Sequence, residues 1–299
     1  MTDKTYDRRS QDVGNVVALE HVNVTVPDQA LASLFYVTGL GFTRDPFIDF
    51  GPANMWVNVG AQQFHLPCRE AQVLRGVIGL VVPSLGELRT RLARLEKRFG
   101  EELAPTRYGC EENADGTLAL TCPWGNRFRV HEAGDEFGGL ALGLPYVTFD
   151  VAPGAAAGVA RFYAEVLGAP GAVVERGGAP CAEVRIGRAQ QLRFAETDAP
   201  LPAYDGHHVA VYLVNFSAPY EALRNRGLIT LETNDHEYRF QDIVDLDSGE
   251  VLATVEHEVR SLHHPMFGRE LVNRDAAQSL FHYRRGRDAY VGLTHAGAG

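Results

Sequence analysis

The chain has 299 residues, 45% of them hydrophobic, which is enough to bury a large core and to form two domains. Its formal net charge of -10 argues against electrostatic binding to nucleic acid or to an anionic membrane surface. No apolar run approaches a membrane span of roughly 20 residues, and segment 1–15 contains no apolar signal region, so we expect a cytoplasmic protein. The four cysteines form no CxxC pair, and we expect them to be reduced thiols.

A strand, a turn and a helix are predicted after this polar leader. In LEHVNVTVPDQALASLFYVTGLGF (19–42), apolar and polar residues first alternate, and a Pro-Asp break then precedes an apolar-periodic segment that ends in Leu-Gly. This pattern is typical of a strand followed by a glycine-capped helix. Later strands are expected in MWVNVG and AQQFHLP, so that the first module runs from Val17 to about Leu66.

A second module is predicted to begin at GVIGLVV and to continue into the helix LGELRTRLARLEKRF. It ends with the strands TLALTC and NRFRVHE, on either side of a turn at 123–126. Glycines at positions 134, 138, 139 and 143 then mark a linker.

The second half of the chain repeats the first. LPYVTFDVAPGAAAGVARFYAEVLGA (144–169) echoes the opening unit, and GRAQQLRF echoes GAQQFHLP, which sets the register of a third module. This module closes with the strands EVRIG and AQQLRFAE. A fourth module contains the strand HHVAVYLV, a helix near 219–226 and the strands YRFQDIVDLD and EVLATVEHEV. Residues 259–299 match no module, and their arginines and histidines indicate a tail that wraps the domains or an interface, such as that of a homodimer.

The repeated unit resembles the opening unit of the vicinal oxygen chelate superfamily, which contains glyoxalases, bleomycin-resistance proteins and extradiol dioxygenases. The residues that carry the likeness are His21, Asp28, Phe35-Tyr36 and Leu40-Gly41-Phe42, with Phe162-Tyr163 and Leu167-Gly168 in the second half. The resemblance implies an α+β fold of tandem βαβββ modules that form two half-barrel domains, at 17–134 and 144–258, followed by the tail at 259–299. It is specific for the fold and less so for function, because the superfamily hosts several reactions and some pure binders.

In that superfamily, the metal ligands come from the first and the last strand of each module. The resemblance transfers these positions to His21 and His65, Val77 and Arg129, Tyr146 and Arg193, and His208 and Ala253, module by module. If the modules pair in sequence order, as in extradiol dioxygenases, neither domain has a complete metal site. If the modules are exchanged, as in four-module glyoxalases, the three histidines meet in one cavity and the two arginines meet in the other.

The first hypothesis is a metal-dependent enzyme that acts on a small oxygenated substrate by dioxygenase, lyase or isomerase chemistry. His21, His65 and His208 would hold a divalent transition metal (Fe, Zn, Mn or Ni), because neutral imidazoles suit such metals and three ligands leave positions open. His236, placed like the proton-transfer histidine of extradiol enzymes, and Glu256 are the acid/base candidates. We expect Glu256 to reach the metal only through a bulge, because its strand parity is opposite to that of Ala253.

The second hypothesis is a metal-free protein that binds or sequesters a small apolar or anionic ligand. Arg129 and Arg193, with Tyr146 beside them, would contact this ligand. Sequential pairing of the modules favours this hypothesis, since it leaves the metal sites incomplete. The arrangement of the modules therefore discriminates between the two hypotheses.

Overall fold

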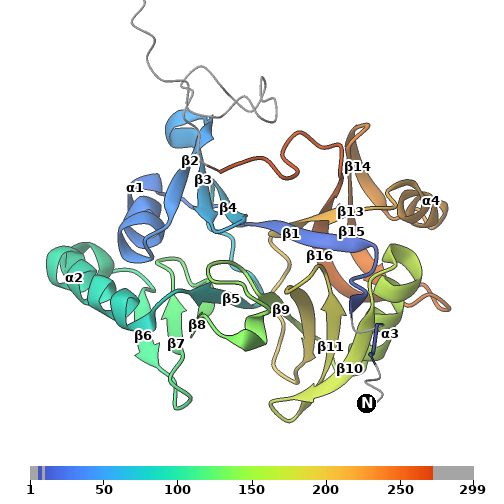
Figure 1. Ribbon diagram of the computed structural model, residues 1–299, viewed down its shortest axis with the longest axis horizontal. Coiled ribbons are helices and arrows are strands. Elements are labelled where there is room, and N and C mark those ends of the chain that lie inside the picture. Colours follow the sequence, from blue (N-terminus) through green and yellow to red (C-terminus); the bar gives the residue numbers. More distant parts are fainter. Residues whose placement is uncertain (1–5, 9–10, 272–299) are drawn as a thin grey trace, which may run out of the picture.

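The computed structural model describes residues 6–8 and 11–271, so the end of the predicted tail, 272–299, lies outside the described residues. The described chain consists of four βαβββ modules that build two eight-stranded sheets (Figure 1). None of its helices is long and apolar enough to cross a membrane.

The first and second modules follow the predicted order of elements. Module one contains β1 (Val16–Asn23), α1 (Gln29–Ala32) continued by the π-helical η2 (Ser33–Gly39), β2 (Thr43–Asp49), the short η3 (Gly51–Ala53), β3 (Asn54–Val59) and β4 (Gln62–Pro67). Module two contains β5 (Gly76–Val82), α2 (Leu85–Leu103), β6 (Gly109–Glu112), β7 (Leu118–Thr121) and β8 (Arg127–Glu132), and the short η4 (Asp135–Phe137) lies in the linker. Asp28 and Ser84 cap the two helices by accepting hydrogen bonds from backbone N–H groups of the first turn.

The third and fourth modules repeat this plan. Module three contains β9 (Tyr146–Val151), α3 (Ala155–Phe162) continued by η5 (Tyr163–Leu167), β10 (Gly171–Arg176), β11 (Ala179–Arg185) and β12 (Gln191–Glu196). Module four contains β13 (His208–Leu213), α4 (Ser217–Asn225), β14 (Ile229–Asn234), β15 (Glu237–Val244) and β16 (Val251–Ser261). Gly168 ends η5 in the left-handed conformation (φ 66°), as expected of the Leu-Gly signature.

The modules are exchanged between the sheets. The first sheet has the order β14-β15-β16-β13-β1-β4-β3-β2 and joins module one to module four. The second has the order β10-β11-β12-β9-β5-β8-β7-β6 and joins module two to module three. Each sheet therefore takes one module from 17–134 and one from 144–258. The ranges 17–134 and 144–258 reflect the repeat in the sequence, and neither range forms a sheet by itself.

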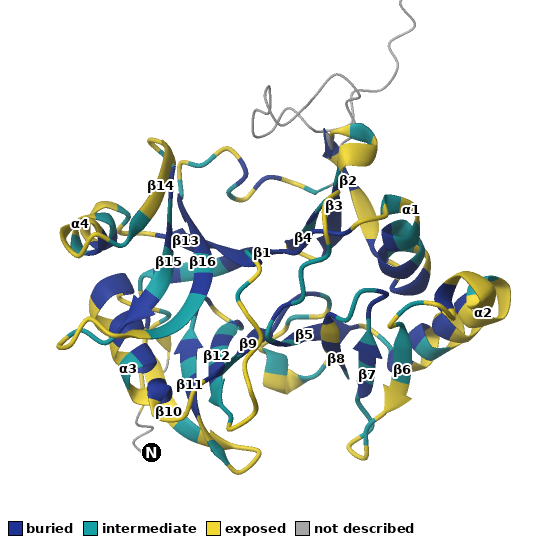
Figure 2. Ribbon diagram, turned by 180° about the vertical axis from the view of Figure 1, so that it is seen from behind, coloured by how far each residue is buried: buried dark blue, intermediate teal, exposed yellow. Residues whose placement is uncertain are grey.

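The two sheets curve in opposite directions and share one core between them (Figure 1). At one end, Phe35 of η2 contacts Phe128 of β8, with ring centres 5.7 Å apart. The neighbouring Tyr36 contacts Phe64 of β4 at 5.2 Å. At the other end, Tyr163 of η5 lies between β12 and β16. The repeated Phe-Tyr pairs thus hold the two sheets together, and Figure 2 shows the buried residues gathered along the strands between them.

After β16, residues 262–271 form a strap that crosses the open face of the first sheet toward β2 and β3 (Figure 1). Arg269 pairs with Asp45 at 2.5 Å, and both side chains are buried. The strap also buries Met266 against Trp56, Phe47 and Ile48. The described part of the predicted tail therefore wraps over a sheet.

Candidate metal centre

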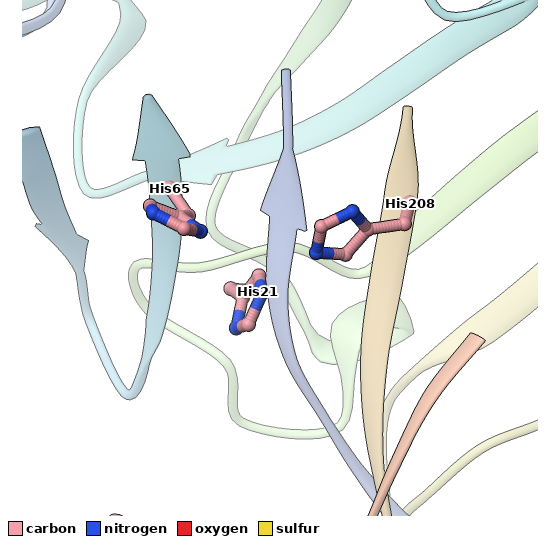
Figure 3. Close-up of side chains that lie close together, drawn as sticks. All are labelled: His21, His65 and His208. Atoms are coloured by element: carbon pink, nitrogen blue, oxygen red, sulfur yellow. The ribbon is translucent and has the colours of Figure 1, made fainter. Parts of the chain in front are cut away.

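Three histidines come together on adjacent strands of the first sheet. His21 lies on β1, His65 on β4 and His208 on β13, and both β4 and β13 pair with β1. In this register, Asn23 is opposite His65 on one side and opposite His208 on the other. One nitrogen of each ring lies within 4.8 Å of the other two, and the rings face a common space in Figure 3.

The ring nitrogens are in a state that suits metal binding. The Nε2 atom of each histidine is shielded from solvent and has no hydrogen-bond partner among the described residues. Burial lowers the pKa of His65 and of His208, so both imidazoles are neutral near pH 7 and keep a free lone pair. Three nitrogens that bind one ion at ~2.1 Å lie about 3.4 Å apart in tetrahedral geometry, so a modest contraction would complete the site.

A β-bulge places a carboxylate beside the first histidine. On β1, Leu19 pairs with Val211 and His21 pairs with Ala210, so Glu20 is an extra residue in the strand. Its Oε2 lies 3.0 Å from Nδ1 of His21. This contact favours the tautomer with the proton on Nδ1, which leaves Nε2 free for a metal.

An aromatic wall fixes the orientation of two of the rings. Trp56, opposite His65 on the neighbouring β3, stacks on the His65 ring with centres 4.0 Å apart and planes inclined by 16°. The Trp56 edge also meets the His21 ring at 4.9 Å. Because Met266 of the strap covers Trp56, this side of the site is apolar and closed to water.

A fourth residue, Glu258, joins the site although the sequence did not indicate it. In module one, His65 is opposite the residue two positions after His21. In module four, Glu258 is opposite Ala210, which is two positions after His208. Glu258 is therefore the counterpart of His65, and its Oε2 lies 3.5 Å from Nε2 of His208.

The assignment of this position to Ala253 was wrong by five residues. β16 is eleven residues long and extends to Ser261, so the position level with the site falls late in the strand. The same offset in the other modules gives Arg129 opposite Gly79 and Arg193 opposite Thr148, as predicted. The length of the segment EVLATVEHEV was the signal that could have located Glu258.

The two proton-transfer candidates differ in position. Glu256 is opposite His208, with Oε1 3.5 Å from its Nδ1, and it accepts a hydrogen bond from Arg239 at 2.7 Å. β16 is irregular here, as expected: Phe240 is opposite His257 whereas Asp242 is opposite Thr254, so β16 has one extra residue in the stretch that contains Glu256. His236 lies in the turn between β14 and β15, where its backbone bonds to Asn234 and Ser261. Within residues 11–271, no contact joins the His236 side chain to the three histidines, and its role stays a prediction.

The charges around the histidines leave an excess of negative charge. The buried or half-buried groups are the carboxylates of Glu20, Glu237, Glu256 and Glu258 and the guanidinium groups of Arg239 and Arg260. Four carboxylates against two guanidinium groups leave two negative charges, which a divalent cation would neutralise. Burial and the nearby Glu258 raise the pKa of Glu237, as expected of a network short of positive charge.

The predicted residues of the second sheet also meet, in a cavity of about 460 Å³ whose lining includes Val77, Arg129, Tyr146 and Arg193. Among the described residues, the His21, His65 and His208 cluster is the one group of three or more His, Cys, Asp or Glu side chains close enough to share a metal. The second cavity therefore has a different chemistry.

Comparison with known proteins gives no match to a family model and no match to a curated protein by sequence. Solved structures match the fold. A "putative dioxygenase" from Bacillus subtilis subsp. subtilis str. 168 is 14% identical, with 89% of each chain covered and a TM-score of 0.55. Glyoxalase I from Zea mays is 11% identical over 81% of this chain and 92% of its own, with a TM-score of 0.53. The chain thus has an α+β fold similar to that of glyoxalase I and of this dioxygenase-named protein, with two eight-stranded sheets.

Proposed function

We propose that the protein is a metal-dependent enzyme that acts on a small oxygenated molecule in the cavity of the first sheet. The observation that carries this proposal is the convergence of His21, His65 and His208, each with a ring nitrogen within 4.8 Å of the other two and with its Nε2 atom shielded from solvent. The surrounding excess of negative charge supports a dication. Sequential pairing of the modules would have favoured the metal-free alternative, and the strand order has the exchanged arrangement instead.

The three imidazoles would hold the metal, with Glu258 as a candidate fourth ligand. This donor set suits first-row transition metals such as Fe, Zn, Mn or Ni. When bound, the metal would act as a Lewis acid toward neighbouring oxygen atoms of the substrate. The similarity of the fold to a glyoxalase and to a protein named as a dioxygenase supports this class of chemistry.

The remaining residues of the site position ligands and exchange protons. Glu20 holds the ring of His21, and Trp56 holds the ring of His65. Glu256 is the preferred proton acceptor, because its side chain is 24% exposed beside His208 and a substrate in the cavity can reach it. His236 is the second candidate, and it would act only if the substrate extends to the turn between β14 and β15.

Metal analysis of the protein purified without an affinity tag tests the proposal. We expect about one transition-metal ion per chain, lost in His208→Ala and retained in His131→Ala, a control on a strand of the second sheet. Oxygen uptake with catechols and turnover of 2-oxoaldehydes, each under matching metals, would then separate dioxygenase from lyase or isomerase chemistry. No bound metal after incubation with Fe(II), Zn(II), Mn(II) and Ni(II), or equal metal in His208→Ala, would refute the proposal.

A further inference from the structure

The second sheet has a cavity at the positions that correspond to the metal centre. By the same strand offsets, Val77 and Tyr146 are the counterparts of His21 and His208, while Arg129 and Arg193 are the counterparts of His65 and Glu258. Internal repetition thus places two guanidinium groups where the first sheet has metal-binding groups. Their fixed positive charge opposes the binding of a cation there.

The lining of this cavity is cationic. Arg129, Arg176 and Arg193 line it together with a single carboxylate, Glu175. Behind the lining, Arg176 and Arg193 share one further carboxylate, that of Glu183, which lies 3.4 Å from Nε of Arg193. Two guanidinium groups that share one carboxylate leave donor capacity for an anion that enters from solvent.

Arg193 is held in a fixed position at the floor of the cavity. Its guanidinium carbon lies 3.8 Å from the centre of the Tyr146 ring, and its Nε and Nη2 donate hydrogen bonds to Oε1 of Gln191 at 3.1 and 2.9 Å. The Tyr146 hydroxyl is itself bonded to Nε2 of His131 at 2.8 Å. Such preorganisation lowers the entropy that is lost when a ligand binds. Burial, with the nearby charge of Arg176, lowers the pKa of Arg193.

Arg129 is available to a ligand for a different reason. Its ion pair with Asp115 is solvent-exposed, with side-chain exposures of 44% and 51%. An exposed pair of this kind contributes little to stability, so an incoming anion can replace Asp115 at little cost. The ring of Tyr146 offers an apolar surface beside the charges, and an adjoining cavity of about 650 Å³ shares Tyr146, Arg176 and Arg193. There is therefore room for an organic body attached to the anionic group.

We propose that the cavity of the second sheet is a binding site for a small organic anion, a carboxylate or a phosphate ester, held by Arg129, Arg176 and Arg193. This site is separate from the metal centre and lies on the other sheet. The planar guanidinium groups bind carboxylate and phosphate oxygens in pairs, which a metal-binding set of histidines does not do.

Isothermal titration calorimetry on the metal-loaded full chain tests this site, with inorganic phosphate and benzoate as probes and chloride at equal ionic strength as the reference. Arg193→Gln should weaken binding of the better probe by about tenfold or more, because it removes a charge-assisted contact. Arg129→Gln should weaken it less. The matched control is Arg89→Gln, since Arg89 on α2 is 39% exposed and also pairs with one carboxylate, that of Glu112.

The outcomes separate this site from the metal centre. Weaker binding in Arg193→Gln, with wild-type binding in Arg89→Gln and equal metal content in all variants, supports the anion site. Absence of binding of both probes at millimolar concentration, or an equal loss in all three variants, would overturn it. The preferred probe identifies the anionic group as phosphate or carboxylate. Because Arg129 is exposed, its variant keeps the test valid even if Arg193→Gln fails to fold.

Discussion

Replacing Glu258 with glutamine removes one charge from the network beside the histidines and keeps nearly the same volume. Glu258 pairs with both Arg239 and Arg260, so each guanidinium group loses one anionic partner. A charge-assisted hydrogen bond contributes about 1.5–3 kcal/mol, whereas breaking a buried pair that has no second partner costs ~3–5 kcal/mol. Arg260 keeps Glu20 and Arg239 keeps Glu256. We therefore expect the metal-free variant to lose about 2 kcal/mol of unfolding free energy, measured by urea denaturation.

The same substitution should weaken metal binding. Glu258 lies 3.5 Å from Nε2 of His208 and supplies part of the excess negative charge, so its loss should lower the affinity for Zn(II) by about 10- to 100-fold. Competition with a chromogenic chelator measures this change. Glu232→Gln, at an exposed glutamate on β14, is the control and should bind as the wild type does. Wild-type affinity in Glu258→Gln would refute the inclusion of Glu258 in the site.

Three further predictions concern the scaffold. Phe128→Ala should cost about 3–5 kcal/mol in urea denaturation, because this buried ring contacts η2 and β4 across the core. Gly76→Ala should prevent stable folding, since φ is 152° and a Cβ would lie 1.8 Å from a backbone oxygen of β9. Gly100→Ala, in open space on α2, should instead raise the free energy of unfolding by about 0.5–1 kcal/mol, and thermal unfolding measures both changes. Arg269→Ala should leave Asp45 as an unpaired buried charge, cost ~3–5 kcal/mol and expose 262–271 to limited proteolysis; wild-type resistance would contradict the role of this pair.

The repeat of strand and helix patterns was sufficient to predict the four modules, because it reports directly on which faces are buried. The strands that the sequence did not locate are β2, β6, β10 and β14, the first strand after each helix. These four are the edge strands of the two sheets. An edge strand is covered on fewer sides, and β10 and β14 are almost wholly exposed, so the alternation that identifies inner strands is weak there.

The pairing of the modules could not be decided from the sequence, since both arrangements use the same strands with the same buried faces. It depends on the contact of β1 with β13 and of β5 with β9, which are tertiary. The three histidines were found because each stands near a strand end that the superfamily pattern identifies. Glu20 and Arg260 were missed because they are 240 positions apart in the sequence. They meet only because a bulge in β1 turns the Glu20 side chain toward the site. No local pattern encodes such contacts.

The two cavities illustrate how four equivalent positions decide what a shared scaffold can bind. On the last strand of each module, one position faces the site of its sheet. It holds His65 in module one, Arg129 in module two, Arg193 in module three and Glu258 in module four. In the first sheet this position supplies a neutral donor and an anion, and the network ends with two uncompensated negative charges. In the second sheet it supplies two cations, Arg129 beside the exposed Asp115 and Arg193 beside Glu183, which Arg193 shares with Arg176. A histidine introduced at Arg129 alone would therefore not create a metal site, because the remaining guanidinium groups would still repel the ion.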